Sequence, residues 1–462
     1  MAFARLAALR LGGRLRPPMA RLRTRKTNHL VAGALARGFA VIVLANLLFL
    51  ALMLIGQINH DVIIGRVRAA FKSGDLGDVD FLWFATHRGW FQYNDCNVLQ
   101  MLANQDAPRL QLALAPKVFF ANEDWKDQCA VLRALTVRDV DPSAFQLLRY
   151  TRYWHGYNVI AALALRRMEL RDLRRMLSDA VWIAIAVLAF AACRSGPHAQ
   201  RTGLAIALTA ATVWGAPYFA PGLTQGPGDT LLLLALAAIA AWPRMTVSLV
   251  IIVPYAAAFG AAVVFLEMLT GQLPIAAAWL IALTLAAARD QEQHVGLAPP
   301  PAALSALMAF GVAAAATVIL KQILAITLGV PRAGEDFLAQ LALYMRVPES
   351  EEGRHAGILL PFIELVRWSK MLTFGRSFAG YGLVVMTALT WVVAAIRGWR
   401  AREHPHGRDI LILVSAALIP IGWVLLLPNH TYIHAPFMVR MLVVPISLAP
   451  LALCWPTARS AL

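Results

Sequence analysis

The stretch GFAVIVLANLLFLALMLIG, residues 38–56, decides what kind of protein this is. Its length matches the roughly 20 mainly apolar residues that a helix needs to cross a bilayer. The preceding residues 1–37 contain nine Lys and Arg and no acidic residue. Because basic residues are retained on the cytoplasmic side of a membrane, we expect residues 38–56 to form an uncleaved signal anchor with a cytoplasmic N-terminus.

The composition of the whole chain agrees with a membrane protein. Its 462 residues are 59% hydrophobic and 15% charged, and the mean hydropathy is +0.61. A soluble chain of this length would form two or three domains with polar surfaces, which this composition does not supply. The apolar excess and the four cysteines also exclude a disordered chain and a disulfide-rich secreted scaffold.

Further apolar segments of similar length follow along the chain. The expected spans are residues 38–56, 177–193, 203–221, 228–242, 245–268, 273–288, 302–329, 378–396, 409–427 and 436–455. We therefore predict an all-α, polytopic membrane protein of about ten transmembrane helices. The predicted regions are a basic cytoplasmic tail (1–37), the first transmembrane helix (38–56), a large periplasmic loop (57–176), helices two to seven (177–330), a second periplasmic loop (331–377), and helices eight to ten with a cytoplasmic C-terminus (378–462).

The net charge of +16 would ordinarily suggest an anionic partner such as nucleic acid. Its distribution indicates membrane orientation instead. The predicted outer connections are balanced, with 11 basic and 11 acidic residues in 57–156 and 6 of each in 331–377. Almost the whole excess thus lies on the predicted cytoplasmic side, as the positive-inside rule requires. We expect membrane lipids as partners and no nucleic acid.

The first outer loop is long enough to have its own structure. Apolar residues recur at helical spacing in 61–72, 96–104 and 127–135, which predicts short amphipathic helices at the membrane interface. The aromatic segment 81–93 is typical of chain that lies on the interface. Cys96 and Cys129 face an oxidising compartment, where they could form a disulfide or remain free.

Asp95, in YNDCNVL (93–99), has two interpretations. Asp is a good N-cap, and Asp95 lies at the predicted start of a helix. Alternatively, it is a carboxylate near the outer membrane surface beside aromatic side chains, which can raise its pKa and suit it to act as a general base. Asp61, Asp78 and Asp80 are alternatives for the same role.

Two basic segments end the first loop. TRYWHGY (151–157) contains Arg152 and His155, which an aromatic interfacial belt alone does not explain. RRMELRDLRR (166–175) places Arg167, Arg171 and Arg174 on one helical face, which predicts an amphipathic helix in the interface. These arginines either pair with lipid phosphates or bind the phosphate of a lipid-linked donor.

A second polar cluster lies near the end of the chain, in NHTYIHAPFMVR (429–440). It contains Asn429, His430, Tyr432 and His434 in a short outer turn, with Arg440 inside the last span. A charged residue within a span is a candidate functional residue, and Lys321 in the seventh span is another, although it could also snorkel to the interface. Asp229 and Glu267, near outer helix ends, are expected to be ordinary interfacial residues.

This layout, with YNDCNVL, TRYWHGY and NHTYIHAPFMVR in its outer connections, resembles the GT-C superfamily of integral-membrane glycosyltransferases. The resemblance covers nearly the whole chain and implies a bacterial inner-membrane enzyme. Such an enzyme moves a sugar from a polyprenyl-phosphate carrier to a glycan or lipid acceptor of the cell envelope, on the periplasmic face. It also implies that Asp95 is the base. Many members carry an Asp-Glu pair, whereas Cys96 follows Asp95 here; no cofactor is certain, and a divalent metal stays open.

From the residues we hypothesise one outward-facing cavity. Its catalytic groups would be Asp95, His430 and His434, and its substrate-binding groups Arg152, His155, Arg167, Arg171, Arg174, Lys321, Asn429, Tyr432 and Arg440, with no metal ligands. The alternatives are a glycoconjugate enzyme of the O-antigen ligase or polymerase type, a transporter or flippase of lipid-linked substrates, and a non-catalytic scaffold.

Overall fold

A computed structural model describes residues 18–57, 60–78, 92–104, 107–121, 128–267, 271–292, 297–348, 357–373 and 376–455. Most of these residues are helical. Within the described part, eight helices are long and apolar enough to cross a membrane: Leu30–Ile55, Leu170–Cys193, Leu249–Leu266, Gln272–Asp290, Pro299–Thr327, Ser377–Arg400, Pro405–Leu426 and Ala435–Leu453. The prediction of a helical, polytopic membrane protein is confirmed at this level.

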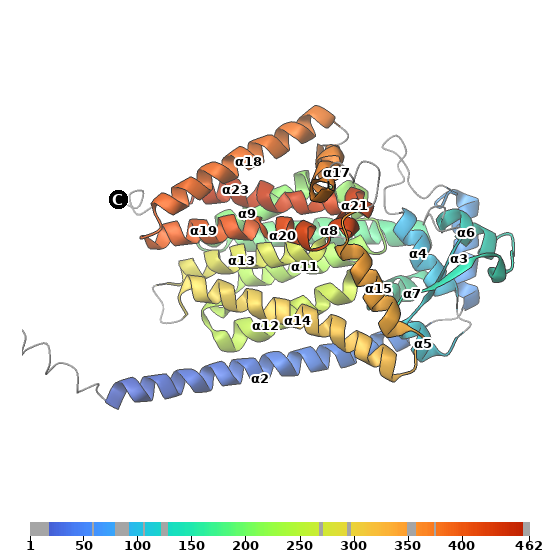
Figure 1. The fold of residues 1–462 in the computed structure, drawn as a ribbon, viewed down its shortest axis with the longest axis horizontal. Coiled ribbons are helices and arrows are strands. Elements are labelled where there is room, and N and C mark those ends of the chain that lie inside the picture. The colour runs from blue at the N-terminus through green and yellow to red at the C-terminus, as the bar shows by residue number, and fades with distance from the viewer. Residues whose placement is uncertain are drawn as a thin grey trace, which may run out of the picture.

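In Figure 1 these spans are α8 (Leu170–Cys193), α12 (Leu249–Leu266), α13 (Gln272–Asp290), α14 (Pro299–Thr327), α18 (Ser377–Arg400), the later part of α2 (Pro18–Ile55), α19 (Pro405–Ala417) with α20 (Ile419–Leu426), and α22 (Ala435–Met438), η5 (Val439–Leu442) and α23 (Val443–Leu453) in succession. The α2 helix already begins at Pro18, so the end of the predicted basic tail continues directly into the first span.

Two of the ten expected spans are shorter helices. The segment predicted at 228–242 is α11 (Gln225–Ala241), of 17 residues. The segment predicted at 203–221 is α9 (Pro197–Thr212), of 16 residues, followed by the short α10 (Ala216–Phe219). Gly215 lies between them with φ +71°, a left-handed conformation that ends a helix and that glycine adopts readily.

The two long connections between spans lie at the same end of the helical bundle (Figure 1). We call this the loop end. It carries α3 (His60–Ser73), α4 (Gln92–Ala103), α5 (Arg109–Leu114), α6 (Gln128–Thr136), α7 (Gly156–Leu165), α15 (Ala333–Met345), α17 (Leu360–Trp368) and α21 (Pro428–Ile433). The start of α2 projects from the opposite end, as the expected alternation of spans requires.

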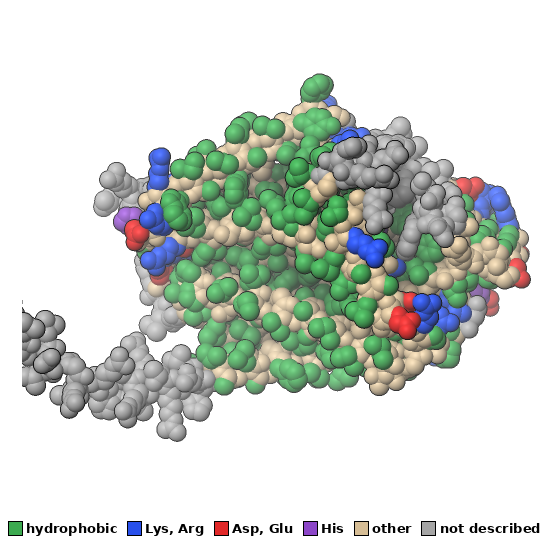
Figure 2. Space-filling model, viewed as in Figure 1, with side chains coloured by type: hydrophobic (Ala, Val, Ile, Leu, Met, Phe, Trp, Pro, Cys, Tyr) green, Lys and Arg blue, Asp and Glu red, His purple; other side chains and the backbone are tan. Residues whose placement is uncertain are grey.

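Hydrophobic side chains cover the middle of the bundle in Figure 2, and charged side chains gather toward its two ends. Phe39, Phe190 and Leu208 are examples of large apolar side chains that are exposed on the protein surface. Such a surface would aggregate in water, because soluble proteins rarely expose wide apolar patches. The exposed belt therefore agrees with burial in a bilayer.

The described residues of 60–165, which we call the loop domain, form a small packed unit. The predicted helices 61–72, 96–104 and 127–135 are confirmed as α3, α4 and α6. An antiparallel pair of strands, β1 (Lys117–Phe120) and β2 (Gln146–Arg149), adds a β element that we did not predict. Most of the aromatic segment 81–93 lies outside the described residues.

The loop-domain helices differ from the interfacial helices that we expected. Every residue of α4 is buried, and the Cys96–Cys129 disulfide links α4 to α6, so α4 forms the centre of the loop domain. The segment RRMELRDLRR is not a separate helix, because its second half is the start of α8. Leu170, Leu173 and Leu177 continue one buried face from the loop domain into the span.

Close packing positions α14 against α12. A Cβ atom built on Gly260 would lie 2.3 Å from the carbonyl oxygen of Phe310, so a larger residue at position 260 would separate the two helices. The loop-end halves of α12 and α14 form one wall of the site described below.

Removal of the Cys96–Cys129 disulfide should destabilise the loop domain. The two cysteines are 33 residues apart, and the loop-closure entropy for that separation corresponds to about 3–4 kcal/mol. We expect the paired change Cys96→Ala and Cys129→Ala to accelerate hydrogen exchange in α4 and α6, while exchange in α13 stays unchanged. Unchanged exchange in all three helices would show that the disulfide adds no stability.

Candidate functional site

The segment TRYWHGY folds tightly around His155. His155 adopts φ +56° at the start of α7, a conformation that is uncommon outside glycine. Its Nε2 lies 2.8 Å from the Tyr150 carbonyl oxygen and its Nδ1 lies 2.7 Å from the Tyr157 hydroxyl. Since a carbonyl only accepts, Nε2–H donates to Tyr150 and the Tyr157 hydroxyl donates to Nδ1. Both ring nitrogens are thus occupied, by Tyr150 and Tyr157.

His155 is also held neutral. Burial lowers the pKa of His155 to about 3, and the positive charges of Lys321 and Arg152 lower it further. A neutral, fully bonded imidazole cannot bind phosphate through charge. The contacts of His155 fix the backbone between Tyr150 and Tyr157, and its predicted role in substrate binding stays a prediction.

Arg152 reaches a cluster of rings from distant parts of the chain. Its Nη1 donates to the Tyr344 hydroxyl at 2.8 Å, and its guanidinium lies 5.0 Å from the centre of the Tyr150 ring. The centre of the Tyr344 ring lies 4.3 Å from the centre of the His430 ring, and the His430 and His434 ring centres are 4.6 Å apart. The predicted site residues Arg152, His430 and His434, which are far apart in the sequence, are thus brought together around Tyr344.

Tyr344 is the residue that connects this cluster, and no sequence pattern predicts its role. It comes from α15, in a connection without a recognisable motif. The Asn429 side-chain amide donates to the Leu343 carbonyl oxygen at 3.0 Å and so fixes α21 to α15. Tyr432 is half-buried on α21. Burial lowers the pKa of His434, and the neighbouring His430 lowers it further.

Lys321 lies fully buried on α14, and its Nζ has no hydrogen-bond partner among the described residues. It does not snorkel to the surface. Two hydrogen bonds fix α14 beside the Arg152 segment: Gln322 donates to the Thr151 carbonyl oxygen at 2.9 Å, and the Trp154 indole donates to the Thr317 carbonyl oxygen at 3.1 Å. The Lys321 ammonium is therefore held in place near Arg152 and His155.

A narrow cleft with a cavity volume of about 60 Å³ is lined by Arg152, and Lys321 is not among its described lining residues. Its lining residues are Arg152, Tyr153, Trp154, Val264, Glu267, Val318, Phe337, Gln340, Leu341 and Tyr344. The walls come from α12, α14 and α15 and are mainly apolar. The cleft thus places one cation, Arg152, beside apolar walls.

Arg440 belongs to a second buried polar group. It forms an ion pair with Asp229, and the Gln272 side chain donates to the same carboxylate at 2.6 Å. The Arg440 guanidinium also lies 4.6 Å from the centre of the Trp214 ring. Asp229 and Glu267 are both buried, so the expectation that they are ordinary interfacial residues is wrong. Two opposite charges in separate spans are the signal that could have predicted the Asp229–Arg440 pair.

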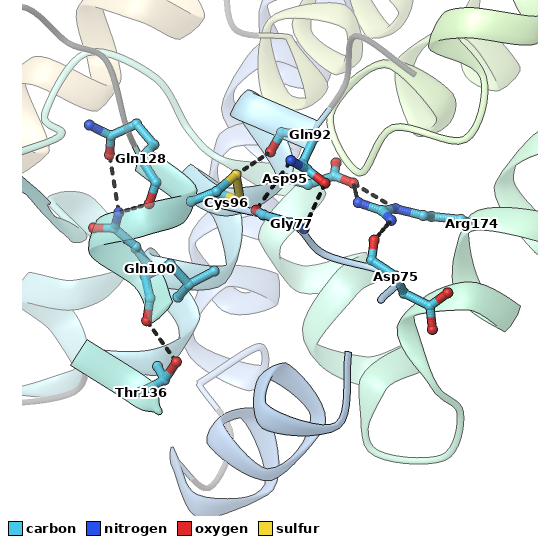
Figure 3. The surroundings of a disulfide bond; sticks show 11 residues. Asp75, Gly77, Gln92, Asp95, Cys96, Gln100, Gln128, Thr136 and Arg174 are labelled. Atoms are coloured by element: carbon cyan, nitrogen blue, oxygen red, sulfur yellow. Dashed lines mark hydrogen bonds and ion pairs between the residues drawn. A yellow bond between two sulfur atoms is a disulfide. The ribbon is translucent and has the colours of Figure 1, made fainter. Parts of the chain in front are cut away.

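Asp95 forms an ion pair at the junction of the loop domain and α8 (Figure 3). Its Oδ2 accepts from two Arg174 nitrogens, at 2.6 and 2.9 Å, and its Oδ1 accepts from the Leu223 N–H at 2.8 Å. Burial raises the pKa of Asp95, and Arg174 opposes that rise. These contacts join α4 to α8. The role of Asp95 as a catalytic base stays a prediction.

The arginines of 166–175 contact acidic and carbonyl groups of the loop domain. Arg171 pairs with Asp75 at 2.8 Å, and Arg174 also donates to the Asp75 carbonyl oxygen at 2.6 Å (Figure 3). The pKa of Asp75 is lowered because hydrogen bonds from Ser73 and Arg171 outweigh its partial burial. Arg167 is exposed. Arg171 and Arg174 thus anchor the loop domain, and their predicted contact with a donor phosphate stays a prediction.

Among the described residues, no group of three or more His, Cys, Asp or Glu side chains could hold a metal ion. Comparisons of the chain with protein-family models, with curated proteins and with solved structures found no match.

Asp95→Asn should destabilise the protein, because it leaves Arg174 buried without its counter-charge. Breaking a buried ion pair costs about 3–5 kcal/mol, whereas an exposed pair contributes about 1 kcal/mol or less. We expect Asp95→Asn to lower the thermal midpoint in detergent clearly more than Asp78→Asn, which breaks the exposed Arg133–Asp78 pair. Adding Arg174→Gln should restore part of the loss. A fully stable but inactive Asp95→Asn variant would instead favour the catalytic role.

Proposed function

We propose that this protein is a membrane glycosyltransferase that moves a sugar from a polyprenyl-phosphate carrier to a glycan or lipid acceptor of the cell envelope. The observation that carries the proposal is the buried Lys321 ammonium near Arg152, without a hydrogen-bond partner in the described structure. Arg152 in turn lines the cleft. An ammonium group in an apolar bundle is unfavourable unless an anion binds it. A phosphate group is an anion that Lys and Arg bind well.

The surroundings of Lys321 and Arg152 favour a phosphate attached to a lipid. The adjoining cleft has apolar walls that include Val318, Phe337 and Leu341. An isoprenoid chain can contact such walls while its phosphate reaches the cations. During glycosyl transfer, negative charge develops on the departing phosphate, and cations fixed in advance stabilise that charge. The same two cations would thus bind the donor and assist the reaction.

The orientation of the bundle fits a reaction outside the cytoplasm. The basic residues 1–37 favour a cytoplasmic location for the start of α2, and the loop end is then periplasmic. The Cys96–Cys129 disulfide in the loop domain is typical of an oxidising compartment. Both observations support a bacterial inner-membrane protein with its site on the periplasmic face.

An acceptor hydroxyl also needs a base. The sequence suggests Asp95, His430 and His434 for this role. His430 contacts Tyr344, which binds Arg152, and His434 contacts His430. Both oxygens of Asp95, in contrast, accept hydrogen bonds from Arg174 and Leu223. The structure adds Glu267, which lines the same cleft as Arg152.

Lys321→Met should separate stability from activity. It replaces a buried ammonium by an apolar side chain of similar length, so we expect the thermal midpoint to rise or stay unchanged. Loss of one group that stabilises transition-state charge should lower transfer about a hundredfold or more. The readout is the profile of lipid-linked and surface glycans in a deletion strain complemented with each variant, measured by mass spectrometry.

Arg152→Gln should fail in the same complementation, and Lys72→Met serves as the control because it removes an exposed positive charge of the loop domain. The donor should accumulate wherever transfer fails. Full complementation by both Lys321→Met and Arg152→Gln would contradict the proposal. An unchanged glycan profile in the deletion strain would contradict it as well and would favour a transporter or scaffold.

A further inference from the structure

Glu267 follows directly after α12 and faces the start of α13. Its side chain is 3% exposed. Oε1 accepts from the Gln272 N–H at 2.6 Å and Oε2 accepts from the Leu273 N–H at 2.8 Å. These bonds satisfy N–H groups that have no partner within the helix, and they fix the orientation of the carboxylate. A carboxylate oxygen has two lone pairs, so each oxygen can accept a further proton donor.

Glu267 also lines the cleft that holds Arg152, and it is the one carboxylate among the described lining residues. The other titratable and charged groups of the cleft lining are Arg152, Tyr153 and Tyr344. Arg440 of η5 lies close enough to lower the pKa of Glu267. Gln272 connects it to the second polar group, since the Gln272 side chain donates to Asp229. Glu267 therefore lies between the cleft and the Asp229–Arg440 pair.

The capping of α13 does not explain why Glu267 also lines the cleft. Burial raises the pKa of Glu267 to about 8, although backbone hydrogen bonds and Arg440 oppose the rise. A group with a pKa near neutrality exchanges protons readily at physiological pH. A capping residue needs no cleft, and the chain offers an example: Asp290 caps α9 by accepting from the Ala199 N–H at 2.8 Å and from the His198 N–H at 3.1 Å.

We propose that Glu267 is the general base of the glycosyl transfer, an assignment that rests on the function proposed above. The acceptor oxygen forms a bond to the anomeric carbon of the donor sugar while its proton passes to a Glu267 carboxylate oxygen. The bond between the anomeric carbon and the phosphate oxygen breaks, and its electron pair leaves with the phosphate next to Arg152 and Lys321. Water then removes the proton from Glu267.

The test compares Glu267→Gln with Asp290→Asn. Each variant neutralises a carboxylate that accepts two backbone N–H groups at a helix start, and the two carboxylates lie at opposite ends of α13. Asp290→Asn also removes the Asp290–His198 pair. Purified variants are mixed with membranes of the deletion strain, which contain the accumulated donor and the acceptor, and the glycan product is followed by mass spectrometry. We expect similar falls in thermal midpoint. Transfer by Glu267→Gln should fall about a hundredfold or more, and transfer by Asp290→Asn should stay within a few-fold of wild type.

The outcomes separate the base assignment from the function. Transfer near the wild-type rate by Glu267→Gln, with Arg152→Gln inactive, overturns the role of Glu267 and leaves the function standing. Equal losses in Glu267→Gln and Asp290→Asn would reduce Glu267 to a capping residue. No transfer by the wild type, or full transfer by Arg152→Gln, overturns the function itself.

A measurement on the wild type covers the case in which Glu267→Gln does not fold. With Glu267 as the base, the single-turnover rate should rise with pH and level off above about pH 8, because the carboxylate must be ionised to accept the proton. A rate that is constant between about pH 6 and about pH 9 overturns the assignment.

Discussion

A charged side chain inside a bilayer needs a counter-charge or a polar partner, and this constraint divides the buried cations of the bundle into two kinds. Arg440 pairs with Asp229, Arg289 with Asp409, and Arg174 with Asp95. Each of these pairs joins segments that are distant in the sequence, so each fixes the relative position of helices. Lys321 differs, because it is fully buried and its ammonium has no hydrogen-bond partner in the described structure. A group that is unfavourable for stability is a good candidate for binding a ligand.

Hydrogen bonds fix the residues around Lys321 in place. Thr151 and Trp154 are hydrogen-bonded to α14, His155 is locked by Tyr150 and Tyr157, and Arg152 is thereby directed toward Tyr344. A site fixed in advance loses little conformational entropy when its ligand binds. The cations, the cleft and Glu267 all lie at the loop end, where a lipid headgroup would be. This common position is the basis of the proposed transfer reaction.

The sequence predicted the helices better than it predicted which residues contact one another. Long apolar runs such as residues 38–56 can hardly be anything but spans, and α3, α4 and α6 were foreseen from helical spacing. Arg174 was recognised as unusual, but its partner Asp95 lies 79 residues away, and pattern alone does not show such pairing. Tyr344 carried no motif, and Glu267 looked like an ordinary helix-end residue. Their importance depends on three-dimensional contacts that bring α15 and α12 to the Arg152 segment.

The central claim is that Lys321 and Arg152 bind the phosphate of a lipid. The most direct test is an experimental structure of the full chain in lipid nanodiscs with polyprenyl phosphate added. The account predicts phosphate density within about 3 Å of both Lys321 Nζ and the Arg152 guanidinium, with the isoprenoid chain along the cleft walls. Lipid phosphate bound elsewhere, with Lys321 contacting only water or protein groups, would contradict it.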